Sequence, residues 1–187
     1  MLTFAIAALR RTVSLSALVL ALAALLAMPA GAAGATYTVD TVADEPDAGG
    51  INGICLTAGL KCTLRAAIEE SNASTSVKDT IAFAATFNGQ FADTIAITLG
   101  ELQITDEVTI DGDGGTPCTT DAAIGGPCVG VSGSVGLDVL SEDVEIKGLA
   151  VTGAGIGIAV LNESTGFTAT NNWLGVKLDG SAGANTT

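Results

Sequence analysis

An imperfect internal repeat constrains the fold of this chain more than any other feature of its sequence. One phrase occurs at 105–112, at 141–148 and, more weakly, at 164–171. It consists of Ser or Thr, two variable residues, two apolar or small residues spaced two apart, and a turn. The second and third copies are offset by 164 − 141 = 23 residues, and the first and second by 141 − 105 = 36. The extra residues fall around Cys118 and Cys128, so the sequence predicts a unit of about 23 residues with one surface excursion.

A unit of this length has room for two or three short strands and no helix. It is too short for a propeller blade and fits one turn of a parallel β-solenoid, whose turns stack at the strand spacing of roughly 4.8 Å. The low aromatic content of 4% and the 24 glycines suit a narrow core of small apolar side chains with tight corners. We therefore predict a mostly β protein, a parallel β-solenoid over residues 91–187. The alternative is an antiparallel β-sandwich.

One segment ahead of the repeats predicts a short helix. Thr63 is a good helix N-cap, and Asn72 marks the expected end. The stripe between them is spaced as one helical face requires, with Leu64, Ala67, Ile68 and Ser71. Elsewhere apolar residues alternate as strands require, at 36–42, 81–83, 95–99, 102–104, 108–110, 144–146 and 156–158.

The first 35 residues are typical of a secretory signal peptide. Arg10 and Arg11 precede an apolar run from 15 to 28, and Ala33-Gly34-Ala35 fits the small-residue cleavage rule. The alternative is a membrane anchor, but the apolar run is shorter than the roughly 20 residues that a span needs. Removal of this segment leaves five basic and 20 acidic residues, a net charge of 5 − 20 = −15, and predicts an extracellular or outer cell-surface location.

The four cysteines all follow this leader and form two local pairs. In an oxidising compartment we expect the disulfides Cys55–Cys62 and Cys118–Cys128, each adding roughly 2–3 kcal/mol of stability. Three connectivities are possible, and the local one requires the least chain travel. A zinc site is the alternative, but the spacings do not match zinc motifs and the chain has no histidine.

The segment Cys62–Ala73 (CTLRAAIEESNA) resembles the signature of the CSLREA domain. Thr63 stands where the family has serine, and Ala66 where it has glutamate. The resemblance implies a secreted or surface protein and right-handed parallel β-helix repeats behind the motif, but no particular activity. We assign 36–90 to a capping region whose helix, pinned by a disulfide, covers the first sheet edge. The matching residues are Cys62, Leu64, Arg65, Ala67, Ile68 and Asn72.

Charge and composition limit the chemistry. Without histidine there is no His-based triad, metal site or acid–base catalyst, and a net charge of −13 disfavours nucleic acid as a partner. Asp111 and Asp113 are spaced to face one side of a strand, so they are the candidate Ca²⁺ ligands, although the flanking glycines fit a turn. The acidic cluster 44–47 fits either a calcium loop or a solvated loop. For Arg65 we favour a structural bond over an anion contact.

These observations favour a non-catalytic function. We expect an exported structural, adhesive or glycan-binding module with no obligatory cofactor, whose partner is an extracellular glycan or a surface protein. The alternative is a fragment of a β-helix polysaccharide lyase or glycoside hydrolase, which would need Asp111, Asp113, Asp138 and Asp143 in one groove. The chain stops just after a repeat phrase without a capping element, so we expect it to be a fragment of a longer protein.

Overall fold

A computed structural model gives the fold of the chain from residue 33 onward. The predicted leader therefore lies almost wholly outside the described residues, and it stays a prediction. Across the described ranges, no helix is long and apolar enough to cross a membrane. These ranges are 33–74, 77–89, 93–113, 118, 126–134, 136–153, 155, 157–161 and 164–183.

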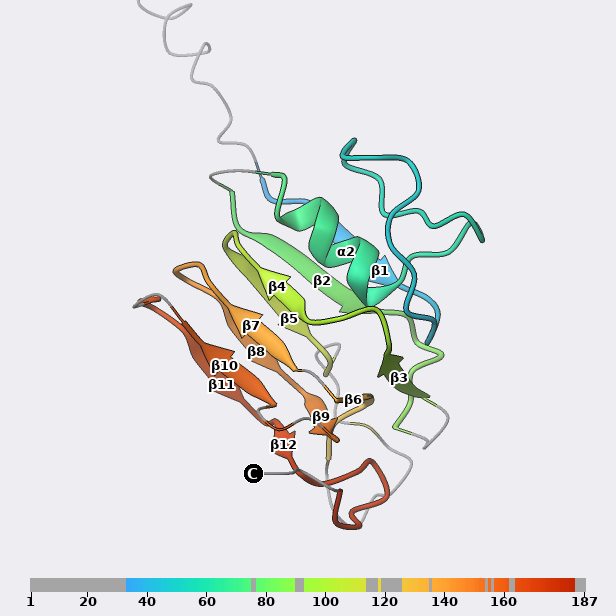
Figure 1. Ribbon diagram of the computed structural model, residues 1–187, viewed down its shortest axis with the longest axis vertical. Coiled ribbons are helices and arrows are strands. Elements are labelled where there is room, and N and C mark those ends of the chain that lie inside the picture. Colours follow the sequence, from blue (N-terminus) through green and yellow to red (C-terminus); the bar gives the residue numbers. More distant parts are fainter. Residues whose placement is uncertain are drawn as a thin grey trace, which may run out of the picture. The chain divides into compact units, whose positions relative to one another are not determined.

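The elements are one short helix and a series of short strands (Figure 1). The helix is α2, Leu64–Ser71. The strands are β1 Thr36–Val39, β2 Asp79–Phe83, β3 Thr94–Ile97, β4 Leu102–Ile104, β5 Val108–Asp111, β6 Val129–Gly133, β7 Leu137–Val139, β8 Glu145–Lys147, β9 Leu149–Thr152, β10 Ile158–Val160, β11 Thr168–Thr170 and β12 Trp173–Leu174.

The strands form three separate parallel sheets. Their orders are β1-β2-β5-β8-β11, β3-β6-β9-β12 and β4-β7-β10, so from β3 onward the chain visits the three sheets in turn. All pairings between these strands are parallel. The antiparallel β-sandwich is therefore excluded, because a sandwich needs neighbouring strands that run in opposite directions.

The predicted right-handed parallel β-helix is also corrected. In the part of the chain that the structure describes, the hydrogen-bond ladders stop at each corner, and the result is three sheets rather than one closed solenoid. The prediction went too far because a sequence repeat specifies only part of a fold. A constant offset determines which strands become neighbours and which direction they run, but it carries no information about handedness or about continuation of the ladder around a corner.

The repeat phrases themselves coincide with strand register. In the five-stranded sheet Ile110 pairs with Ile146, and Ile146 pairs with Ala169, which reproduces the offsets of 36 and 23 residues. The corners at the ends of the second and third phrases require unusual backbone: Gly148 has φ 69° and Asn171 has φ 54°. Both lie in the left-handed region that glycine and asparagine tolerate best.

Stacked apolar side chains from the three sheets share one core. Each sheet contributes a row of residues in register. Most of them are buried, whereas β10, β11 and β12, the last strands of the three sheets, are partly or fully exposed. Deleting one such side chain costs about 2–5 kcal/mol. The fully buried members include Ile81, Ile110 and Ile146 in one sheet, Ile95, Val131 and Val151 in the second, and Leu102 and Leu137 in the third.

Helix α2 forms where the capping signals predicted it. The Thr63 hydroxyl accepts a hydrogen bond from the Ala66 amide (3.0 Å), and Asn72 is the C-cap. The helix contacts β1, β2 and β4 (Figure 1). Its apolar face, with Leu64 and Ile68 buried, joins the core at the end where β1 and β4 are edge strands.

The amide side chain of Asn72 completes the edge of β4. Its Nδ2 donates to the Gln103 carbonyl (2.8 Å), and its Oδ1 accepts from the Thr105 amide (2.8 Å). One side chain thus replaces a missing neighbouring strand, because unpaired edge groups are both costly and prone to aggregation. Asn172 also bonds to backbone on both sides of its amide, but it bridges the corner between the interior strands β8 and β9. Its Nδ2 donates to the Ile146 carbonyl, and its Oδ1 accepts from the Leu149 amide.

We expect Asn72→Ala to lower the free energy of unfolding by about 1–3 kcal/mol, because two backbone groups lose their partners. Urea denaturation measures the change. The matched control is Gln103→Ala, whose exposed side chain makes neither of these hydrogen bonds and whose loss should change stability by less than about 0.5 kcal/mol. Equal effects from both variants would contradict the strand-mimic role.

Candidate functional site

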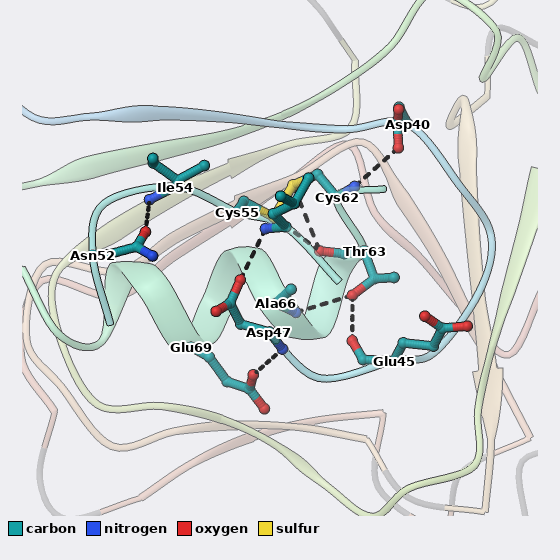
Figure 2. Close-up of a disulfide and its surroundings, with 11 residues drawn as sticks. Asp40, Glu45, Asp47, Asn52, Ile54, Cys55, Cys62, Thr63, Ala66 and Glu69 are labelled. Carbon is teal, nitrogen blue, oxygen red and sulfur yellow. Dashed lines mark hydrogen bonds between the residues drawn. A yellow bond between two sulfur atoms is a disulfide. The ribbon is translucent and has the colours of Figure 1, made fainter. Parts of the chain in front are cut away.

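The candidate functional site is the long connection between β1 and α2. Residues 40–62, here called the stapled loop, lie beside α2 and are closed by the disulfide Cys55–Cys62, whose Cα atoms are 5.1 Å apart (Figures 1 and 2). Cys118 and Cys128 form the second disulfide, so both predicted pairs are present. Two disulfides are compatible with an oxidising, extracellular location.

Carboxylates hold the stapled loop from inside. Asp47 accepts hydrogen bonds from the amides of Gly49 (2.9 Å) and Leu56 (2.8 Å), and its own amide donates to Glu69 of α2 (2.7 Å; Figure 2). Glu70, only 2% exposed, accepts from the Gly53 amide at 2.6 Å. Backbone donors of this kind stabilise a buried carboxylate without any cation. The path of the loop is therefore fixed by α2 as well as by the disulfide.

The disulfide and the carboxylates hold different parts of the loop, so their removal has separable effects. We expect Cys55→Ser/Cys62→Ser to speed amide hydrogen exchange at residues 54–62 and to leave the sheets unchanged. Mass-spectrometric exchange on the exported form measures this. Faster exchange throughout β5, β8 and β11 in the same variant would contradict a local role.

Arg65 of α2 joins the stapled loop to the turn between β3 and β4. Its Nε donates to Asp44 Oδ1 (2.7 Å), and its Nη2 donates to the Gly100 carbonyl (2.7 Å). The Asp44 carboxylate also accepts from the amides of Thr98 (2.6 Å) and Leu99 (2.8 Å). The two side chains are 11% and 3% exposed, so this is a buried ion pair whose remaining lone pairs and donors are used by backbone.

This environment changes the acidity of Asp44. Burial by itself raises the pKa of a carboxyl, but the hydrogen bonds from Arg65, Thr98 and Leu99 and the positive charge of Arg65 outweigh it and lower the pKa of Asp44 below its ordinary 3.8. Because the folded pKa is the lower one, the unfolded chain takes up the proton first on acidification. The stabilisation is present above pH 3.8 and is lost as the pH falls through the lowered folded pKa.

We therefore expect the stability of the wild-type protein to fall more steeply with acidification below pH 4 than that of Asp44→Asn. Chemical denaturation at a series of pH values measures both slopes. Glu142→Gln, which neutralises an exposed carboxylate, is the control and should keep the wild-type slope. An Asp44→Asn slope equal to that of the wild type would contradict the assignment.

The calcium candidates have other partners. Asp111, on β5, forms an ion pair with Lys147 of β8 (3.2 Å), and its Oδ1 accepts from the Asp113 amide (3.1 Å). Asp113 accepts from the Asn171 side chain at 3.4 Å. Among the described residues, no three His, Cys, Asp or Glu side chains are grouped so that they could hold a metal ion. The pair thus serves as a corner tie, and calcium binding there stays a prediction.

The acidic groove that a hydrolase would need is not assembled by the described elements. Asp138 belongs to β7 in the three-stranded sheet, whereas Asp111 belongs to the five-stranded sheet. Asp143 lies in the turn before β8, with φ 52° and its amide donating to Thr165. The described elements thus place three of these acids on strands of two sheets and in a turn, and the enzymatic alternative stays a prediction.

The stapled loop exposes apolar side chains that the sequence analysis did not single out. Ile51 is 75% exposed, Leu60 74% and Ile54 60%, within a loop in which the Asp44 and Asp47 carboxylates are bonded to backbone amides. Single exposed apolar residues are ordinary, but several on one constrained loop are not. The signal was available in the aliphatic residues that punctuate the turn-rich segment before and between Cys55 and Cys62.

The structure also corrects the interpretation of the acidic cluster 44–47. Asp44 is buried against Arg65, and Asp47 organises the loop backbone, so these two are not solvated charges; calcium binding by the cluster stays a prediction. Arg65 makes the structural bond that the sequence analysis favoured.

Comparison of the chain with family models, with curated proteins and with solved structures finds no match. The resemblance of Cys62–Ala73 to the CSLREA signature therefore stays a prediction.

Proposed function

We propose that this protein is a non-catalytic adhesion module outside the cell, and that it binds a protein partner through the stapled loop. The observation that carries the proposal is the exposure of Ile51, Ile54 and Leu60 on a loop that the fold holds rigidly. The proposed location draws on the leader over residues 1–35, the two disulfides and the resemblance of the helix segment to the CSLREA signature.

The backbone of Leu60 supports a role other than stability. Leu60 has φ 59°, in the left-handed region, and its side chain lies in solvent. That conformation costs an ordinary residue roughly 1–2 kcal/mol, and an exposed side chain recovers none of it by packing. The turn is held by the Leu60 amide, which donates to the Thr57 carbonyl (2.9 Å), and not by the side chain. Backbone strain that no side-chain packing offsets is found at functional sites.

Preorganisation gives the loop an advantage in binding. The disulfide, the Asp47 carboxylate and the two glutamates of α2 fix its backbone before any partner arrives. Binding then costs little conformational entropy, because the loop is already ordered. A larger share of the free energy of the apolar contacts therefore appears as affinity.

Charge indicates which kind of partner fits. The stapled loop carries four acidic residues and one lysine, and the whole chain has a net charge of −13. An anionic membrane surface is disfavoured by this sign. We therefore propose a protein with an apolar pocket bordered by Lys and Arg, whose charge complements the loop and speeds encounter.

Selection of a phage-displayed peptide library on the exported protein tests this function. We expect enriched peptides that combine apolar residues with Lys or Arg, whose binding is lost in Ile51→Ser/Ile54→Ser. Val160→Ser, at an exposed apolar residue of β10, is the matched control and should retain binding. Peptides that bind the double variant as well as the wild type, or the absence of any enriched peptide, would overturn the proposal.

Leu60→Asn separates recognition from folding. Asparagine tolerates the left-handed conformation, so we expect the free energy of unfolding to stay the same or rise by up to about 1 kcal/mol. Binding of the selected peptides should fall at the same time. Thermal denaturation together with peptide titration measures both, and a strongly destabilised variant would show that Leu60 is a packing residue.

A further inference from the structure

A hollow of about 210 Å³ lies on the outer face of the four-stranded sheet. Its floor is made by Gly130 of β6 and Ala150 of β9, which pair in register with each other, and Gly130 also pairs with Thr94 of β3. Their neighbours Ile95, Val131 and Val151 point into the core, so this row faces outward. Small residues on the central strands leave the space open, since a Cβ at Gly130 would lie 2.5 Å from Thr94 Oγ1.

The chain after β12 folds back to form the opposite wall. The Lys177 amide donates to the Ser181 carbonyl (2.9 Å), the Gly183 amide donates to Gly175 (2.7 Å), and Val176 and Ala182 form an antiparallel bridge. This return places Leu178, only 7% exposed, and Lys177 at the hollow. The hollow is thus enclosed by three strands and a hydrogen-bonded turn.

Hydroxyl groups around the hollow lack hydrogen-bond partners within the described part of the chain. The hydroxyls of Thr94, Ser132 and Thr152 line it together with the Lys177 side chain. None of these side chains forms a hydrogen bond or a close ion pair with another described residue, although Thr152 is only 8% exposed. The nearby Asp179 is exposed; its carboxylate accepts from the Ser181 amide and feels the positive charge of Lys177 without forming a close ion pair with it. Unused donors and acceptors beside an apolar floor are the pattern of a small-molecule site.

We propose that this hollow binds a polyhydroxylated carboxylate of the size of one sugar unit. The Lys177 ammonium is placed to pair with the carboxylate. The three hydroxyls both donate and accept, as sugar hydroxyl groups require, and Ala150 and Leu178 present an apolar surface to the C–H groups. The volume is below the roughly 300–1,000 Å³ of pockets for drug-sized ligands, so a single unit fits better than an extended chain.

This site shares no residue with the stapled loop and does not depend on the function proposed for it. Its ligand is a small hydroxy acid rather than a protein, and its positive charge is local in an otherwise acidic chain. The two proposals therefore fail independently.

Isothermal titration with D-galacturonate and D-gluconate tests the proposal. D-galactose, which lacks the carboxylate, and acetate, which lacks the hydroxyl groups, are the control ligands. We expect saturable binding of the two hydroxy acids with Kd on the order of 1 mM, and at least about tenfold weaker binding of galactose and acetate. Lys177→Gln should raise the Kd of both hydroxy acids by about tenfold or more. Lys61→Gln, at an exposed lysine of the stapled loop, should bind as the wild type does.

Ala150→Leu fills the hollow and should abolish binding of both hydroxy acids. Thermal denaturation of each variant shows whether it is folded, and Lys177→Gln remains informative if Ala150→Leu is not. The proposal is overturned if neither hydroxy acid saturates, if galactose or acetate binds equally well, or if Lys177→Gln and Lys61→Gln bind alike.

Discussion

The buried ion pair between Asp44 and Arg65 is the interaction on which the first edge of this structure depends. Removing two charges from water costs several kcal/mol per ion, and attraction between them does not by itself offset that cost. Here the cost is offset because Arg65 also donates to the Gly100 carbonyl and Asp44 accepts from the Thr98 amide. The pair thereby connects the stapled loop, helix α2 and the β3–β4 turn.

The same principle explains why so acidic a chain folds. Several of its carboxylates accept hydrogen bonds from backbone amides and so act as structural groups: Asp47 and Glu70 hold the stapled loop, and Asp79, 1% exposed, accepts from the Ala35 amide. Asparagine side chains act in a related way: Asn72 completes the edge of β4, and Asn172 bridges the corner between β8 and β9. Polar side chains thus satisfy the backbone groups that edges and long loops leave open.

Local signals in the sequence were sufficient for the helix and for strand register. Thr63 and Asn72 bound α2 because capping is a short-range interaction, and the repeat offsets became the pairing of Ile110 with Ile146. Long-range features could not be predicted from the sequence. Asp44 was expected in a solvated or calcium-binding loop, because its partner Arg65 lies 21 residues away in the sequence. Strand β9 is buried along its whole length, so its sequence shows no alternation of apolar and polar residues. Likewise, only the folded return after β12 brings Lys177 to the outer face of the sheet.

A double-mutant cycle between Asp44→Asn and Arg65→Gln, read by chemical denaturation, tests the central claim most directly. If this pair holds the loop, the helix and the turn together, the coupling energy is expected to be about 2 kcal/mol or more, within the range of residues that share one network. A coupling energy below about 0.5 kcal/mol, as found for exposed surface pairs, would contradict the account.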